Sequence, residues 1–178
     1  MRKKKYIICL LVLLTCMFSS AAGVNKMFVQ RKGEAGWVYH IFPKKMPSVN
    51  KKIKNLNYDF TFTEQSDSVT LIATVVINAP LKPNSLRIVS CGKLSEYEVE
   101  TLYLIPKGSK YEYRLLAKLP FEEWESMYSC TSPYKLNYIF NDGSNFEEIS
   151  FMYSDSKWKS KRKYLLIILN TIKLNTGK

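Results

Sequence analysis

The sequence is poor in the side chains on which most enzymes depend. It contains a single histidine, His40, and four cysteines in 178 residues. It has no nucleophile elbow, no glycine-rich phosphate loop and no zinc-type spacing of Cys and His. A lone histidine in a strand-like segment is more often structural than catalytic. The sequence therefore predicts a protein that is not an enzyme and that uses no cofactor and no metal.

Two groups of glutamates are the remaining candidates for acid–base chemistry. One group shares a face of a predicted strand, as a solvent-facing edge does. The other lies on the polar side of a predicted helical turn. An enzyme of this kind needs two carboxyl groups facing each other across about 5 to 9 Å, and an envelope enzyme is the least favoured of three function classes. The two groups are Glu96, Glu98 and Glu100, and Glu122, Glu123 and Glu125.

Long apolar runs are also scarce, and the one that exists opens the chain. Tyr6–Phe18 spans 13 residues after a basic start, whereas a helix needs about 20 to cross a bilayer. Small residues follow, with Ser20 and Ala22 placed three and one before a cleavage site. The pattern predicts a signal peptide, residues 1–22, and a protein exported to the periplasm, the cell envelope or the medium.

Two other topologies for this leader stay open. No charge occurs between Tyr6 and Val24, so an uncleaved leader would hold the protein in the membrane with its basic start inside. The segment Leu13–Cys16 resembles a bacterial lipobox, which would place a lipid on Cys16. Thr15 is bulkier than the residue that normally precedes the lipidated cysteine. An intact mass of the mature protein separates the three topologies.

The positive charge is concentrated at the two ends of the chain. The formal net charge is +12. Residues 23–54 carry eight cations against one acid, and residues 157–178 carry seven cations and no acid, while residues 55–156 are net acidic. Of the 27 cations only five are Arg, although phosphate recognition favours the arginine fork. An exported, lysine-dominated chain is not expected to bind nucleic acid.

The acidic middle alternates apolar and polar residues with period two, between turn residues. Val69–Ile77 is apolar on both faces, which predicts a central position in a sheet. The predicted strands, seven in all, are Tyr58–Thr63, Val69–Ile77, Ser85–Ser90, Tyr97–Leu104, Tyr111–Leu119, Tyr134–Phe140 and Phe146–Tyr153.

A single helical turn is predicted between the fifth and sixth strands, at Pro120–Tyr128, where it crosses between sheets. Short strands at this spacing with one crossover predict an all-β domain over residues 57–154, a Greek-key β-sandwich that resembles the immunoglobulin and fibronectin type III architecture. The resemblance is architectural. The immunoglobulin pattern of Cys on the second strand, Trp on the third and Cys on the sixth is absent.

Two cysteines follow the leader, Cys91 and Cys130. In such a sandwich the third and sixth strands run antiparallel side by side, so the end of one lies near the start of the other. A disulfide is therefore expected in an oxidising compartment, where it would contribute about 4 kcal/mol. Two separate buried thiols are the alternative.

Residues 23–56 form an extension before the sandwich. The segments Met27–Gln30 and Trp37–Phe42 flank glycines and predict a hairpin, and Met46–Asn55 reads as an exposed basic linker. Three side chains of the second segment share one face, and they either cover one side of the sandwich or form a platform for a ligand. These are Trp37, Tyr39 and Ile41.

Residues 155–178 predict a basic amphipathic helix capped by Asp155 or Ser156. Its apolar stripe and cations allow three arrangements: a solvated charged face, docking on the acidic middle of the same chain, or binding to an anionic membrane. The residues available for docking are Trp158, Lys159, Arg162, Lys163, Leu165, Ile168, Leu169 and Ile172.

Together these patterns favour a non-catalytic, exported module that binds another envelope or secreted protein or has a structural role. The alternative is a peripheral membrane protein that uses its basic ends. The position of the stripe 165–172 distinguishes the two, because a stripe packed on the sandwich favours protein binding.

Overall fold

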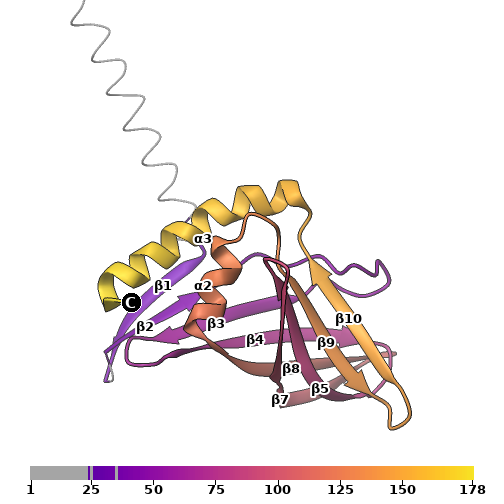
Figure 1. The fold of residues 1–178 in the computed structure, drawn as a ribbon. Coiled ribbons are helices and arrows are strands. Elements are labelled where there is room, and N and C mark those ends of the chain that lie inside the picture. Colours follow the sequence, from indigo (N-terminus) through magenta and orange to yellow (C-terminus); the bar gives the residue numbers. More distant parts are fainter. Residues whose placement is uncertain (1–23, 25, 35) are drawn as a thin grey trace, which may run out of the picture.

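The computed structural model describes residues 24, 26–34 and 36–178, which form two antiparallel β-sheets and the two helices named α2 and α3 in Figure 1. The six-stranded sheet has the order β1-β2-β3-β4-β8-β7, and the four-stranded sheet has the order β10-β9-β5-β6. The strands are β1 (Phe28–Gly33), β2 (Gly36–Ile41), β3 (Asn57–Thr63), β4 (Ser68–Ile77), β5 (Lys82–Ser90), β6 (Lys93–Glu98), β7 (Glu100–Lys107), β8 (Lys110–Pro120), β9 (Lys135–Asn141) and β10 (Phe146–Met152).

Strand β4 lies at the centre of the six-stranded sheet, as its sequence predicts. It pairs antiparallel with β3 on one side and with β8 on the other. Its residues Val69, Leu71, Ala73 and Val75 have no exposed surface and face the core. The other face of the strand is partly covered, which accounts for apolar residues on both sides of the sequence pattern.

The predicted strand Tyr97–Leu104 is wrong, because the chain changes sheets within it. Strand β6 ends at Glu98 at the edge of the four-stranded sheet, and β7 begins at Glu100 at the edge of the six-stranded sheet. One residue, Val99, separates them. Both segments are extended, so the period-two pattern runs through the crossing without interruption.

The aromatic core extends from the sheets to helix α2 (Phe121–Ser129), which replaces the predicted single turn with nine residues. Its Trp124 is fully buried, with its ring centroid 6.1 Å from that of Phe60 and 5.6 Å from that of Phe121. Phe121 also packs on Phe62, with centroids 4.9 Å apart. Helix α2 lies between α3 and the strands in Figure 1, and its aromatic side chains pack into the core.

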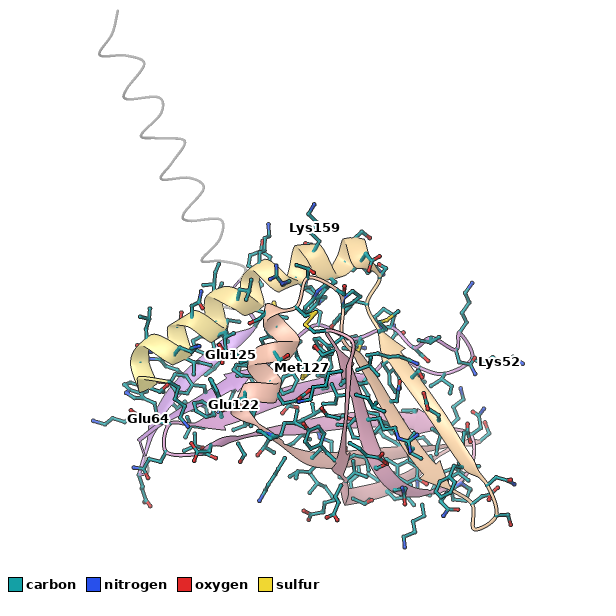
Figure 2. All side chains as sticks on the ribbon, in the orientation of Figure 1. Lys52, Glu64, Glu122, Glu125, Met127 and Lys159 are labelled. Carbon is teal, nitrogen blue, oxygen red and sulfur yellow. A yellow bond between two sulfur atoms is a disulfide. The ribbon has the colours of Figure 1, made fainter. Side chains whose placement is uncertain are left out.

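The N-terminal hairpin of β1 and β2 forms as predicted and continues the six-stranded sheet, since β2 pairs with β3. Residues 42–56, here called the strap, then cross to the other sheet, where Ser48 bridges Phe151 of β10. The strap returns through a bridge between Met46 and Leu56, both fully buried. The prediction of an exposed linker over Met46–Asn55 is therefore wrong at its start, where Met46 is buried and Ser48 is half-buried. Its tip projects into solvent, as Lys52 does in Figure 2.

Helix α3 (Asp155–Thr176) lies over α2 and the hairpin strands in Figure 1. Ser154 occupies the N-cap position. The predicted caps are therefore wrong, Asp155 by one position and Ser156 by two. The helix ends at Gly177, whose φ of 71° is in the left-handed region that favours glycine, and the Gly177 N–H donates to the Lys173 carbonyl.

Candidate functional site

The lone histidine has a structural partner. His40 lies in β2 with its Nδ1 atom 3.1 Å from the Thr61 hydroxyl of the neighbouring strand. Within residues 24, 26–34 and 36–178, no group of three or more His, Cys, Asp or Glu side chains is placed to hold a metal ion. His40 therefore contributes a cross-strand contact.

The first glutamate group is split between the two sheets, and the carboxylate of Glu96 already has two hydrogen-bond donors as partners. The Glu96 carboxylate accepts hydrogen bonds from the Ser85 hydroxyl at 2.5 Å and from Arg87 at 3.0 Å. These two contacts, that of Ser85 first, lower the pKa of Glu96. Glu98 stays on the edge strand β6, while Glu100 belongs to β7.

The second glutamate group does not form the uniformly polar face predicted for it. Glu123 is buried at 7% exposure, where it accepts a hydrogen bond from the Ser95 hydroxyl at 3.1 Å and lies 3.5 Å from Lys93 Nζ. Glu125 pairs with Lys173 of α3 at 2.5 Å, whereas Glu122 is exposed. The carboxylates at 123 and 125 thus fasten α2 to β6 and to α3.

Strand β7 is exposed to solvent along its whole length. It is an edge strand whose one ladder partner is β8, so the N–H and C=O groups on its outer side have no strand partner. Its centre carries four consecutive large apolar residues, each between 41% and 45% exposed. These are Leu102, Tyr103, Leu104 and Ile105.

The other three sheet edges are protected by known devices. The outer edge of β10 is covered by the strap, because Val49 N–H donates to Ser150 and Met152 N–H donates to Pro47. Strands β1 and β6 are six residues long and carry charges, Arg31 and Lys32 on one and Lys93, Glu96 and Glu98 on the other. Strand β7 has a bulge at Leu102 and a proline, Pro106, near its end, but the stretch Tyr103–Ile105 between them is uncharged and exposed.

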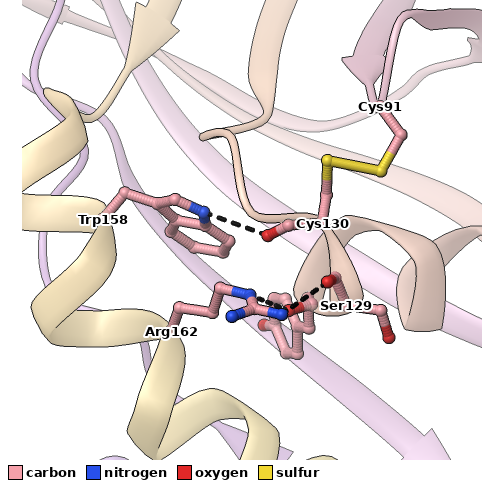
Figure 3. The surroundings of a disulfide bond; sticks show 6 residues. Cys91, Ser129, Cys130, Trp158 and Arg162 are labelled. Carbon is pink, nitrogen blue, oxygen red and sulfur yellow. Dashed lines mark hydrogen bonds between the residues drawn. A yellow bond between two sulfur atoms is a disulfide. The ribbon is translucent and has the colours of Figure 1, made fainter.

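The two cysteines form the expected disulfide, Cys91–Cys130 (Figure 3). The antiparallel pairing of β5 with β9 brings the end of one strand to the start of the other, with Val89 opposite Lys135. The Cys130 carbonyl also accepts a hydrogen bond from the Trp158 indole N–H at 3.3 Å. The bridge therefore joins the β5–β6 turn to the segment beneath α3.

The aromatic platform predicted on β2 is wrong. Tyr39 and Ile41 have no exposed surface, and Trp37 is half-buried against the core. The Tyr39 ring stacks between Phe28 and Phe62, with centroids 6.0 Å away on each side. Because β2 continues the six-stranded sheet, these side chains cover its inner face, which was the structural alternative.

The apolar stripe of α3 is packed inside the molecule, so the docking surface predicted there is wrong for its apolar members. Trp158, Leu165, Ile168, Leu169 and Ile172 are all buried. The helix is fastened to the acidic middle of the chain, because Lys173 pairs with Glu125 and Lys178 pairs with Asp67 at 2.6 Å.

The cations predicted for docking on α3 divide between the interior and the solvent. Arg162 is turned toward α2, where it donates to the Tyr128 and Ser129 carbonyls. Lys159 and Lys163 are exposed, and Lys159 points away from the sandwich in Figure 2. Of the predicted cations, these two lysines remain available to a partner.

The leader, with the proposed lipid site Cys16, lies outside the described residues. No helix in the described part of the chain is both long enough and apolar enough to cross a membrane. Protein families, curated proteins and solved structures give no match to this chain.

Sequence reasoning missed β7 as a site, although a signal was present. The four consecutive apolar residues at its centre do not alternate with polar ones, unlike those of the half-buried strands. Such a run is typical of a strand covered on both faces. Here it occupies an uncovered edge, and the conflict between pattern and position marks the candidate site.

Proposed function

We propose that this protein is a non-catalytic exported module that binds another protein of the cell envelope or secreted fraction by strand addition at β7. The observation that carries the proposal is the exposed, uncharged apolar stretch at the centre of that edge strand. In strand addition the partner's backbone completes the hydrogen-bond ladder, and alternate side chains provide specificity.

The chemistry of β7 specifies the partner segment. Tyr103 and Ile105 lie opposite Arg114 and Glu112 of β8 and share one face, whereas Leu104 lies opposite Tyr113 on the other face. Leu102 stands at a bulge in this ladder. The fitting segment is an extended one with apolar side chains on both faces. Glu100 and Lys107 stand at the two ends of β7, so a partner with a basic residue at one end and an acidic residue at the other complements it.

The experiment places a photo-crosslinking residue at Tyr103 and exposes the full-length protein, exported in its native cells, to light. The expected result is one discrete adduct that disappears in the Leu104→Lys variant, because an edge lysine blocks strand pairing. A matched control places Lys at Leu174, an apolar residue 85% exposed on α3. This control should keep the adduct.

Mass spectrometry of the adduct identifies the site on the partner. A crosslink to an extended apolar segment of another exported protein supports the proposal. Absence of a discrete adduct, an adduct that survives Leu104→Lys, or one formed with a second copy of this chain overturns it.

We also propose that the sandwich is a variant of the immunoglobulin-type Greek key. In that architecture, strands A, B, E and D share one sheet and strands C, F and G share the other. Taking β3 to β10 as successive strands, with β6 as an addition beside C, the two sheets have the corresponding orders β3-β4-β8-β7 and β10-β9-β5-β6. A crystal structure with a different strand order would contradict the assignment.

The proposed location outside the cytoplasm is compatible with the Cys91–Cys130 disulfide, since such bonds persist in oxidising compartments. Intact mass of the native protein, measured with and without reduction, tests both the bond and the cleavage after Ala22. A native mass that includes the whole leader contradicts the cleavage.

A further inference from the structure

The two basic ends of the chain meet at one pocket of about 440 Å³. The N-terminal end contributes Lys26 and Lys44, on either side of the β1–β2 hairpin, and helix α3 contributes Lys157 and Lys161. Ser160 and Tyr164 of α3 add hydroxyl groups, and no carboxylate is among the lining residues. Two lysines from each of the basic segments therefore line one pocket.

Lys161 occupies the most unusual position in this pocket. Its Nζ atom is buried and has no hydrogen-bond partner in the described part of the chain. The ammonium lies 4.8 Å from the centroid of the Tyr153 ring, a favourable contact that supplies no counter-charge. A buried cation without an anion is costly, so such groups are normally paired.

The charged groups around Lys161 are themselves cations, so they repel its ammonium group and do not neutralise it. Burial, followed by repulsion from Lys44 and Lys157, lowers the pKa of Lys161 to about 8. The other ionisable groups in the site are Lys26 and the phenol of Tyr164. An anion in the pocket would relieve the repulsion between the ammonium groups and give Lys161 a partner.

We propose that this pocket binds the phosphate group of an organic phosphate. Four ammonium groups match a multiply charged oxyanion, and lysine binds phosphate as a point charge. The pocket is larger than one phosphate group, and Met27 and Phe42 supply an apolar wall beside the lysines. The ligand therefore carries an apolar substituent next to its phosphate, as an anionic lipid headgroup or a soluble alkyl or aryl phosphate does.

Hexyl phosphate is the probe for the shared chemistry, with binding to the mature protein measured by calorimetry at pH 7. The Lys161→Met variant removes the buried charge and keeps the shape of the side chain. Its affinity for hexyl phosphate should fall about tenfold or more, the loss of one charge-assisted contact. The matched control Lys159→Met, on the same helix but directed into solvent, should bind within about twofold of the wild type.

Folding of the variant is checked independently. Lys161→Met removes an unpaired buried ammonium, so its unfolding midpoint should equal or exceed that of the wild type. Weaker binding together with an undiminished midpoint supports the pocket. Absence of hexyl phosphate binding by the wild type, or equal weakening by the two variants, overturns it.

Vesicles distinguish the two sources of the phosphate. If the ligand is a lipid headgroup, the wild type should sediment with phosphatidylglycerol vesicles but not with phosphatidylcholine vesicles, and Lys161→Met should abolish sedimentation. If hexyl phosphate binds and neither vesicle sediments the protein, the ligand is a soluble organic phosphate. Sedimentation that Lys161→Met leaves unchanged, with no hexyl phosphate binding, overturns the proposal. This site is independent of β7, so either result leaves strand addition to its own test.

Discussion

The guanidinium of Arg162 caps helix α2 by donating a hydrogen bond of 2.6 Å to the Ser129 carbonyl, with a second of 3.2 Å to the Tyr128 carbonyl. The last carbonyls of a helix have no partner within it and carry its negative dipole end. Helix α2 has no basic residue in its own last turn. Arg162 of helix α3 therefore supplies the cation that caps the C-terminal end of α2.

Replacing Arg162 with Ala should lower the free energy of unfolding by about 1 to 3 kcal/mol, because two carbonyls lose a charged donor. Urea denaturation followed by tryptophan fluorescence measures the change. Lys159→Ala removes a cation of the same helix that points into solvent, and it should alter stability by less than about 0.5 kcal/mol. Equal stability of the two variants would show that the cap contributes nothing.

Loss of the disulfide should destabilise the sandwich strongly. Cys91 and Cys130 are separated by 39 positions, and closing a loop of this size contributes about 4 kcal/mol in the chain-entropy model. The paired variant Cys91→Ser with Cys130→Ser should therefore unfold at a much lower urea concentration. Alkylation of the denatured, unreduced mature protein should label no thiol, and two labelled thiols would contradict the bond.

A buried tyrosine cluster should make the fold sensitive to alkali. The Tyr58 hydroxyl lies 2.8 Å from that of Tyr134 and 3.0 Å from that of Tyr153, which donates to the Lys44 carbonyl. Burial raises the pKa of Tyr58 and Tyr134 well above 10 and that of Tyr153 to about 12. The unfolded chain loses these protons near pH 10 while the folded chain keeps them, so stability should fall as the pH rises above 10.

Absorbance at 295 nm follows the ionisation of these phenols, which should appear together with unfolding rather than before it. Tyr58→Phe removes the central hydroxyl and should lower the free energy of unfolding by about 1 to 3 kcal/mol. Tyr103→Phe, on the exposed strand β7, is the matched control and should have little effect. Ionisation of all tyrosines in the folded protein at pH 10 would contradict the cluster's burial.

Lys161 should produce the opposite trend in a lower pH range. Its pKa is about 8 in the folded protein and near 10.5 in the unfolded chain. Between these values the unfolded state binds more protons, so stability rises with pH, most clearly from about 8 to 9.5, before the tyrosines act. Urea denaturation in this range should show the rise in the wild type. Lys161→Met should flatten the curve, and an unchanged slope would contradict the burial of this ammonium.

Much of the sheet structure could be predicted because its signals are local. The double-sided apolar pattern of Val69–Ile77 identifies a central strand, and the glycines between Phe28 and Ile41 indicate a hairpin. The crossing at Val99 could not be predicted, since backbone extension continues through it and only the choice of neighbouring strand changes. The proximity of Cys91 and Cys130 could be predicted, because antiparallel pairing brings the end of β5 close to the start of β9.

The candidate sites depend on contacts between distant parts of the chain. Whether Leu102–Ile105 is covered depends on which strand lies beside β7, and alternation along the sequence does not contain that information. Lys44 and Lys161 come from opposite ends of the sequence, and each alone resembles a solvated charge. The stripe of α3 was predictable as apolar, but the sequence left open whether α2 or a membrane covers it.

The strap could be cut at its tip without the two parts of the protein coming apart. Its exposed tip at Lys51 and Lys52 lies between two pairs of anchored positions, Met46 with Leu56 and Ser48 with Phe151. A tryptic cut at the tip would break the chain but no strand ladder, and the hairpin would stay attached through β2 and β3. The two fragments should therefore migrate as one species under native conditions, which makes this tip a natural position for a label or for new chain ends.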